Sequence, residues 1–212
     1  MARMTARERR DQLVGVAKAV FAELGYDGAT VEEIAARAGV SKPVLYEHFG
    51  GKEGIYAVVV DRESTRLLDK ITSYIHGEAG GRQMVHASAM AFLHYIEEDP
   101  DGFRVLTRDS PSSLGTGGIG GLLADIAAKA EGVLQDFFVR SGLDPDSAII
   151  YAGGLVGMVA HVGAWWAPVQ QPDAATVAAH ITALAYHGLK GLPSNPVASL
   201  DVPTPTSEQS SR

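Results

Sequence analysis

The sequence contains no cysteine, and only 7% of its 212 residues are aromatic. Without cysteine the chain can form no disulfide scaffold, thiolate zinc site, iron–sulfur cluster or catalytic thiolate. The first 30 residues carry many charges and lack the apolar run of a secretory signal, so we expect a cytoplasmic protein. A hydrophobic content of 46% excludes global disorder and is enough for a folded core.

Basic residues are in the minority, with 18 Lys and Arg against 25 Asp and Glu. This acidity is unevenly distributed along the chain. Residues 1–52 contain 8 basic and 7 acidic residues, whereas residues 53–212 contain 10 and 18. The N-terminal part can therefore present a basic face to nucleic acid although the whole chain is acidic.

Apolar residues recur at helical spacing, and no segment shows the alternation of period two that is typical of strands, so we predict an all-α fold. Gly25 ends the first predicted helix, and Thr30 with Glu33 forms a capping box before the second. We expect the remaining helices at Ser41–Gly50, Lys52–His76, Arg82–Asp99, 103–106, Leu122–Ser141, Pro145–Trp166 and Asp173–Leu192. A turn is expected at 99–102, a loop at 110–121 and a disordered tail at 193–212, where Pro, Ser and Thr are dense.

Residues 25–52 have the pattern of a helix-turn-helix, with Gly39 at the turn. Such a motif reads the major groove with its second helix and binds phosphate at helix N-termini. We therefore expect DNA contacts from Thr30 and Ser41 to phosphate, from Lys42, Pro43 and Val44 near the bases, and from Tyr46, His48 and Lys52 along the backbone. The alternative is that Thr30 and Ser41 are only helix caps and that the motif is structural.

The segment AKAVFAELGYDGATVEEIAARAGVSKPVLYEHFGGKEGIYAVVVD, residues 17–61, resembles the N-terminal signature of TetR-family transcriptional regulators. Pro43 and the pair Gly50–Gly51 depart from the usual pattern. The resemblance implies a homodimer that binds a palindromic double-stranded DNA operator and an all-helical C-terminal part that binds a small effector and dimerises. Repression is the usual outcome in the family and is expected here, with activation as the alternative.

We accordingly expect an N-terminal three-helix helix-turn-helix domain at 1–51. A C-terminal helical ligand-binding and dimerisation domain should follow at 52–192, with 52–76 as its connecting helix. Residues 91–106 and 154–158 resemble, more weakly, the lipid-synthesis regulators of the family that sense long-chain acyl-CoA. The predicted pocket for such an apolar effector comprises Phe92, Phe103, Arg104, Leu106, Leu123, Phe138, Leu155, Met158, Val162 and Trp166. The alternative is that the apolar members are plain core, and that Arg104 and Arg108 pair with nearby acids.

Residues 148–169 contain no Asp, Glu, Lys or Arg and are long enough to span a bilayer. We reject a membrane span because the flanking charges, Asp146 and Asp173, are acidic. Small residues at helical spacing instead predict close helix contact in a four-helix dimer interface. The predicted interface comprises Gly153, Gly157, Ala160, Ala164, His180, Ala183 and His187.

Other chemistries find little support in the sequence. Residues 115–120 match GxGxxG by letter but lack the preceding strand of a dinucleotide site. His86 and His94 can share a helix face, but a third metal ligand is missing. We expect no enzyme, cofactor or metal. The rival interpretation is a small-molecule carrier or α-helical enzyme with a vestigial helix-turn-helix.

Overall fold

The computed structural model describes residues 5–74, 80–107 and 119–194, and every regular element within these ranges is helical. The all-α prediction is thus confirmed. The elements are α1 (Ala6–Gly28), α2 (Val31–Ala38), α3 (Lys42–Phe49), α4 (Lys52–Tyr74), α5 (Gly81–Glu98), α6 (Pro100–Thr107), α7 (Ile119–Ser141), the 3-10 turn η2 (Pro145–Ser147), α8 (Ala148–Trp166) and α9 (Ala174–Lys190).

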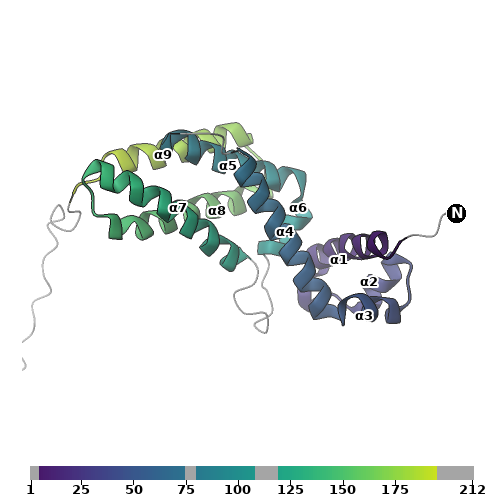
Figure 1. Ribbon diagram of the computed structural model, residues 1–212. Coiled ribbons are helices and arrows are strands. Elements are labelled where there is room, and N and C mark those ends of the chain that lie inside the picture. Colours follow the sequence, from purple (N-terminus) through teal and green to yellow (C-terminus); the bar gives the residue numbers. More distant parts are fainter. Residues whose placement is uncertain (1–4, 75–79, 108–118, 195–212) are drawn as a thin grey trace, which may run out of the picture.

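Helices α1, α2 and α3 gather around the N-terminal end of α4, and we call these three helices the headpiece (Figure 1). Their shared core is apolar and fully buried at Leu13, Ile34 and Leu45. The first turns of α4 contribute Ile55 and Val59 to the same core. Burial of these side chains gives the small headpiece a stable attachment to the long helix.

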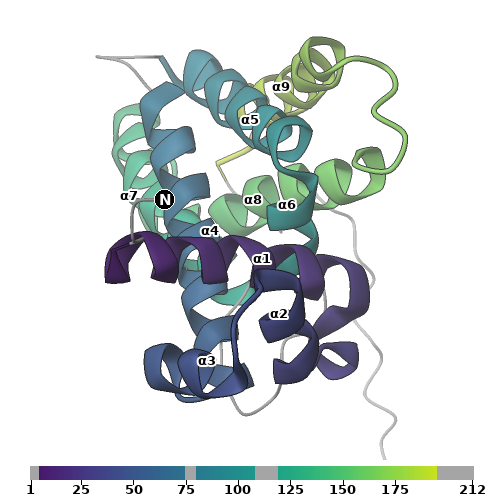
Figure 2. The same cartoon turned by 90° about the vertical axis from the view of Figure 1, so that its right-hand side faces the viewer.

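The helices after α4, which we call the body, form two layers (Figures 1 and 2). Helix α5 packs on α4 and α9, whereas α7 packs mainly against α8. One buried apolar cluster runs from the headpiece through α4, α5 and α6 to α9. A second, smaller cluster lies between α7 and α8 around Phe138. The headpiece therefore shares a continuous core with part of the body.

Two predicted details of the headpiece are corrected. The backbone leaves the helical region at Gly25 (φ 74°), as expected, but helical structure resumes and α1 runs on to Gly28. Thr30 Oγ1 accepts the Glu33 N–H at 3.1 Å, so Thr30 caps α2. The reciprocal half of the predicted capping box is missing, because the Glu33 carboxylate accepts from Arg37 Nε at 2.6 Å instead.

The turn predicted at 99–102 shrinks to Asp99, because Pro100 already begins α6. The Asp99 carboxylate accepts the Gly102 N–H at 2.8 Å and closes the first turn of α6, which explains the misprediction. Helix α7 begins at Ile119, earlier than the loop predicted at 110–121 implies. Residues 75–76, 108–118 and 195–212 of the predicted helix end, loop and tail lie outside the described residues, as do Arg108 and most of the GxGxxG match.

Helices α5 and α8 approach closely where α8 contributes Gly163, which is buried. A Cβ at Gly163 would overlap the Phe92 ring and lie 3.1 Å from Ile96 Cδ1. Phe92 cannot easily yield, because it is buried and packs edge-to-face on Phe103 with ring centroids 5.9 Å apart. Glycine at 163 thus sets the distance between the two layers.

Gly163→Ala should lower the free energy of unfolding by about 1–3 kcal/mol, because the added methyl group overpacks a filled core. Gly132→Ala on α7 is the matched control, since nothing lies within 4 Å of its Cβ position. The control should be neutral or more stable because alanine favours a helix. Urea unfolding followed by circular dichroism measures both, and equal stability of the two variants would contradict the packing argument.

Candidate DNA-binding interface

The helix-turn-helix is built on the α2–α3 turn. Gly39 adopts a left-handed conformation (φ 66°), and the Val40 N–H bonds Ala35 O at 3.0 Å. A side chain at position 39 would resist this backbone conformation. Leu45 is fully buried against the headpiece core, which fixes the inward face of α3. The predicted helix-turn-helix is confirmed, and the opposite face of α3 is free to meet DNA.

The predicted DNA contacts divide by exposure. Ser41, Lys42 and Pro43 are exposed at the start of α3, and the Tyr46 side chain is 53% exposed. Ser41 occupies the N-cap position but makes no side-chain cap hydrogen bond within the described residues, in contrast to the predicted cap. Val44 is half-buried and packs against the headpiece core. Together with Thr30 at the start of α2, the exposed members form one candidate surface.

Lys42 is paired across the motif. Its ammonium contacts the Glu32 carboxylate on α2, and both side chains are more than half exposed. The hydrogen bond from Lys42 lowers the pKa of Glu32 from its ordinary value, so Glu32 is ionised at neutral pH. Phosphate must therefore compete with an acidic neighbour for this lysine.

Lys52 has a structural role that sequence reasoning missed. Its ammonium donates to Tyr26 O at 3.0 Å and lies 4.3 Å from the centre of the Tyr26 ring. That ring packs edge-to-face on Tyr56 of α4, with centroids 4.9 Å apart. Lys52 thus ties the start of α4 to the end of α1, and the predicted phosphate contact stays a prediction.

Arg10 is a second residue that the sequence did not single out. Its guanidinium donates to His48 O at 3.0 Å and lies 4.6 Å from the centre of the Phe49 ring. Arg10 therefore holds the C-terminal end of α3 against α1. His48, predicted to contact phosphate, is half-buried and takes part in this contact through its backbone.

The predicted effector pocket divides between the two apolar clusters. The buried side chains of Phe92, Phe103, Leu106 and Trp166, with the partly buried Met158 and Val162, lie in or against the large cluster. Phe138 and the partly buried Leu155 belong to the small one, and Leu123 is half-buried on α7. Arg104 is exposed and donates to Asp101 at 2.9 Å, which is the surface pairing considered as the alternative.

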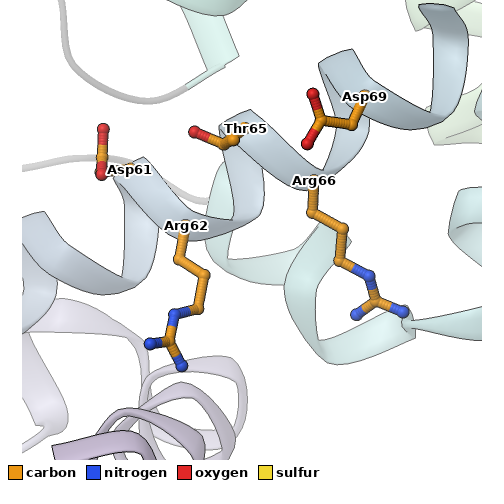
Figure 3. A pocket seen from close by; sticks show the side chains of 5 residues that line it. All are labelled: Asp61, Arg62, Thr65, Arg66 and Asp69. Carbon is orange, nitrogen blue, oxygen red and sulfur yellow. The ribbon is translucent and has the colours of Figure 1, made fainter. Parts of the chain in front are cut away.

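A hollow of about 370 Å³ lies elsewhere, on the surface of α4, lined by Asp61, Arg62, Thr65, Arg66 and Asp69. The two arginines leave the helix on one side, and the other three residues leave it on the opposite side (Figure 3). Arg62 bonds Asp11 at 2.5 Å, and Arg66 contacts Asp99. Both arginines are thus already paired, and the hollow adds nothing to the predicted apolar pocket.

Two histidines considered as metal ligands have protein partners. His86 Nδ1 lies 3.3 Å from Thr182 Oγ1, and His94 Nδ1 lies 2.6 Å from the Tyr74 hydroxyl. Among residues 5–74, 80–107 and 119–194, no three metal-binding side chains gather into a group. Each imidazole therefore links two helices of the protein.

The predicted dimer residues lie on a surface that one chain leaves open. Gly153, Gly157, Ala164, His180, Ala183 and His187 are exposed, and Ala160 is half-buried. Large apolar side chains surround them: Ile150 is 71% exposed, Leu184 67% and Trp165 62%. The segment Pro145–Trp166 is long and apolar enough to cross a membrane, and 17% of its most apolar window is buried. Such a surface calls for a partner or an apolar environment.

Comparison with known proteins connects this geometry to one family. A family model described as bacterial regulatory proteins, tetR family, matches residues 13–59. The chain is 31% identical to the HTH-type transcriptional activator FasR of Mycolicibacterium smegmatis over 196 residues, which cover 90% of this chain and 87% of FasR. A TetR-like transcriptional regulator from Rhodococcus sp. RHA1 has a TM-score of 0.73 at 22% identity, covering 90% of this chain and 100% of that one. The fatty acid degradation regulator FadR from Bacillus halodurans has a TM-score of 0.71 at 21% identity, covering 89% and 99%.

Substitutions of Lys42 and of Glu32 should have opposite effects on DNA affinity. Lys42→Ala should weaken binding to all duplexes and lower the slope of log K against log salt by about one per subunit. Glu32→Gln should tighten binding severalfold, because it removes a competing carboxylate beside the phosphates. Fluorescence anisotropy on a labelled duplex at several salt concentrations measures both.

Lys70→Ala is the control for this pair, because Lys70 lies near the far end of α4 and pairs with Glu98 of α5. Its affinity and salt slope should match those of the unmodified protein. Weaker binding by Glu32→Gln, or an unchanged slope in Lys42→Ala, would exclude this pair from the DNA interface.

Proposed function

Because this chain belongs to the TetR family of DNA-binding transcriptional regulators, which are not enzymes, we propose that it binds a palindromic operator as a homodimer and responds to an apolar effector of the long-chain acyl-CoA class. Residues 1–51 would bind DNA, and residues 52–192 would bind the effector and form the dimer, in the cytoplasm. The observation that carries the proposal is the open α3 face on a headpiece that shares its core with an apolar helical body.

Activation is the direction of control that we favour, although the family resemblance by itself favoured repression. FasR, which matches this chain over 90% of its length, is named an activator. A reporter behind the operator distinguishes the two directions by the sign of the response.

The exposed surface of α8 and α9 supports the homodimer. The side chains of Ile150, Trp165 and Leu184 would each gain by leaving water. Between them, Gly157 and Ala164 allow a second helix to approach closely. A second copy related by a two-fold axis would cover this surface with itself. The acidic flanks Asp146 and Asp173 disfavour a membrane as the cover.

The packing between the two layers of the body supports an apolar effector. Leu155, Met158 and Val162 on α8 are half-buried and lie against different apolar clusters, so the two layers are incompletely joined. An acyl chain between the layers would complete the burial of these side chains. The name of the structural neighbour FadR, a fatty acid degradation regulator, agrees with this ligand class. Because Arg104 pairs with Asp101 at the surface, the polar head of the ligand would face solvent.

Gly157→Leu tests the dimer. Its Cβ position has nothing within 4 Å in one chain, so a larger side chain should leave the fold intact and obstruct the α8 interface. The variant should sediment as a monomer or aggregate and lose operator binding, since one half-site binds too weakly. Gly132→Leu, equally open but on α7, should stay dimeric. A stable Gly157→Leu dimer would place the interface elsewhere.

A series of acyl-CoA esters tests the effector. Each buried methylene contributes about 0.8 kcal/mol, so affinity should rise steeply with chain length and then level off once further methylenes stay in water. Binding should change operator affinity by about 5- to 150-fold. Titration of each ester into an operator complex measures both effects. If chain length has no influence, or DNA affinity stays constant at saturation, the acyl-CoA proposal fails while the regulator remains.

A further inference from the structure

Two buried carboxylates meet partly exposed cations where the headpiece joins the body. The group comprises Lys18 of α1, Glu63 and Arg66 of α4, Tyr95 of α5 and Asp99 at the start of α6, and we call it the polar junction. The Glu63 and Asp99 side chains are only 5% and 9% exposed. Two cations and two carboxylates balance the charge, so the group can stay ionised inside the protein.

Most contacts in the polar junction join different helices, and the Arg66–Glu63 contact lies within α4. Lys18 Nζ lies 2.5 Å from Asp99 Oδ2 and 3.1 Å from Glu63 Oε1. The Tyr95 hydroxyl donates to Glu63 Oε2 at 3.0 Å, and Arg66 contacts Asp99. Burial by itself raises the pKa of the Asp99 carboxyl, but the bonds from Lys18 and Gly102 outweigh it and lower the pKa. Lys18 is therefore the link between the headpiece and both carboxylates.

The first turn of α6 packs directly on this group. A Cβ at Gly102 would lie 2.5 Å from Glu63 Oε2, 2.7 Å from the Tyr95 hydroxyl oxygen and 3.0 Å from Asp99 Cγ. Asp99 also holds Gly102 through its backbone N–H. Neither α6 nor α1 can therefore shift far without separating the buried carboxylates from their cations, and such a separation is costly.

We infer that Lys18, Glu63 and Asp99 are positioning residues for DNA binding, which set the orientation of the headpiece on the body and make α1 follow α6. Apolar burial is non-directional, whereas ion pairs and hydrogen bonds are favourable only within narrow limits of distance and angle. The continuous apolar core stabilises the contact between headpiece and body, and the polar junction determines the angle between these two parts. This inference depends on DNA binding by the headpiece, and on neither the dimer nor the chemical identity of the effector.

The absence of native cysteine allows a direct measurement of that angle. Cysteines introduced at the exposed positions Glu47 on α3 and Gln83 on α5 accept spin labels. When the doubly labelled protein is mixed with an excess of unlabelled protein, the two labels of one chain are the only pair close enough to measure. The distance between them therefore reports the orientation of the headpiece whether or not the chain dimerises. Asp99→Asn should broaden or displace this distance, because the amide can still cap α6 but no longer pairs with Lys18 and Arg66.

Glu98→Gln is the matched control. It also changes an acid to an amide one residue away, and it also breaks a pair with an α4 cation, Lys70, but outside the polar junction. Its label distance should equal that of the unmodified protein. Gly102→Ala should displace the distance as Asp99→Asn does, and Gly132→Ala should not.

The double variant Lys18→Met/Asp99→Asn separates positioning from stability. Removing both partners leaves Glu63 with Arg66, so no buried charge is unbalanced and stability should recover relative to either single variant. DNA affinity should stay about tenfold below that of the unmodified protein, and the label distance should stay broad, because the directional contacts are gone. The probe is a duplex selected by the unmodified protein from a random library.

The possible outcomes are distinct. If the unmodified protein selects no duplex, DNA binding fails as a premise. If it does, and the folded single and double variants keep its narrow distance and its affinity, the inference about positioning is overturned. If affinity in the variants simply follows their unfolding free energy and recovers in the double variant, the polar junction is structural only and the inference is likewise overturned.

Discussion

Shared burial along α4 is the constraint on which the rest of the structure depends. Ile55 and Val59 enter the headpiece core and Leu67 enters the body, and all three are fully buried in one continuous cluster. Since apolar contact is non-directional, this burial stabilises the union of the two parts without fixing how they are turned. Orientation must come from directional contacts. Lys52 joins the start of α4 to the end of α1, and Arg10 joins α1 to the end of α3. The polar junction adds directional contacts between α1, α4 and α6.

Helix ends and turns were predicted well because they depend on the conformational preferences of residues close together in the sequence. Gly39 and Gly50 both adopt positive φ at helix ends, and Pro43 lies in the first turn of α3, as their conformational preferences require. The failures involve partners that are distant in the sequence. Lys18 and Asp99 are separated by 81 residues, so nothing near Asp99 distinguishes a loop turn from a buried helix cap. The exception is Glu33, whose carboxylate pairs with Arg37 four residues on and so does not complete the predicted capping box.

The sequence predicted the position of the helix-turn-helix motif, but predicted less well which side chains its surface presents and how they pair. Periodicity and the glycine turn located α2 and α3, and exposure of Ser41, Lys42 and Tyr46 follows once Leu45 faces inward. Pairing partners were not predictable, because the Lys42–Glu32 contact depends on how the two helices cross. The body shows the same limit: aromatic residues at helical spacing mark buried positions, but their division between two clusters is set by the packing of α7 on α8.

Charge compensation in the headpiece bears on how its orientation would affect DNA binding. Lys42 contacts Glu32, Arg37 contacts Glu23 and Glu33, and Arg62 of α4 contacts Asp11. Because these cations have acidic partners, we expect the headpiece to attract phosphate weakly at a distance and its non-specific DNA affinity to be low. In the proposed homodimer, specific binding would then come from the fit of helix ends and side chains in two grooves at once. A small change in the angle of α1 would spoil that fit, whereas a strongly basic headpiece would still bind. Internal pairing of charges would therefore make DNA binding sensitive to the orientation of the headpiece.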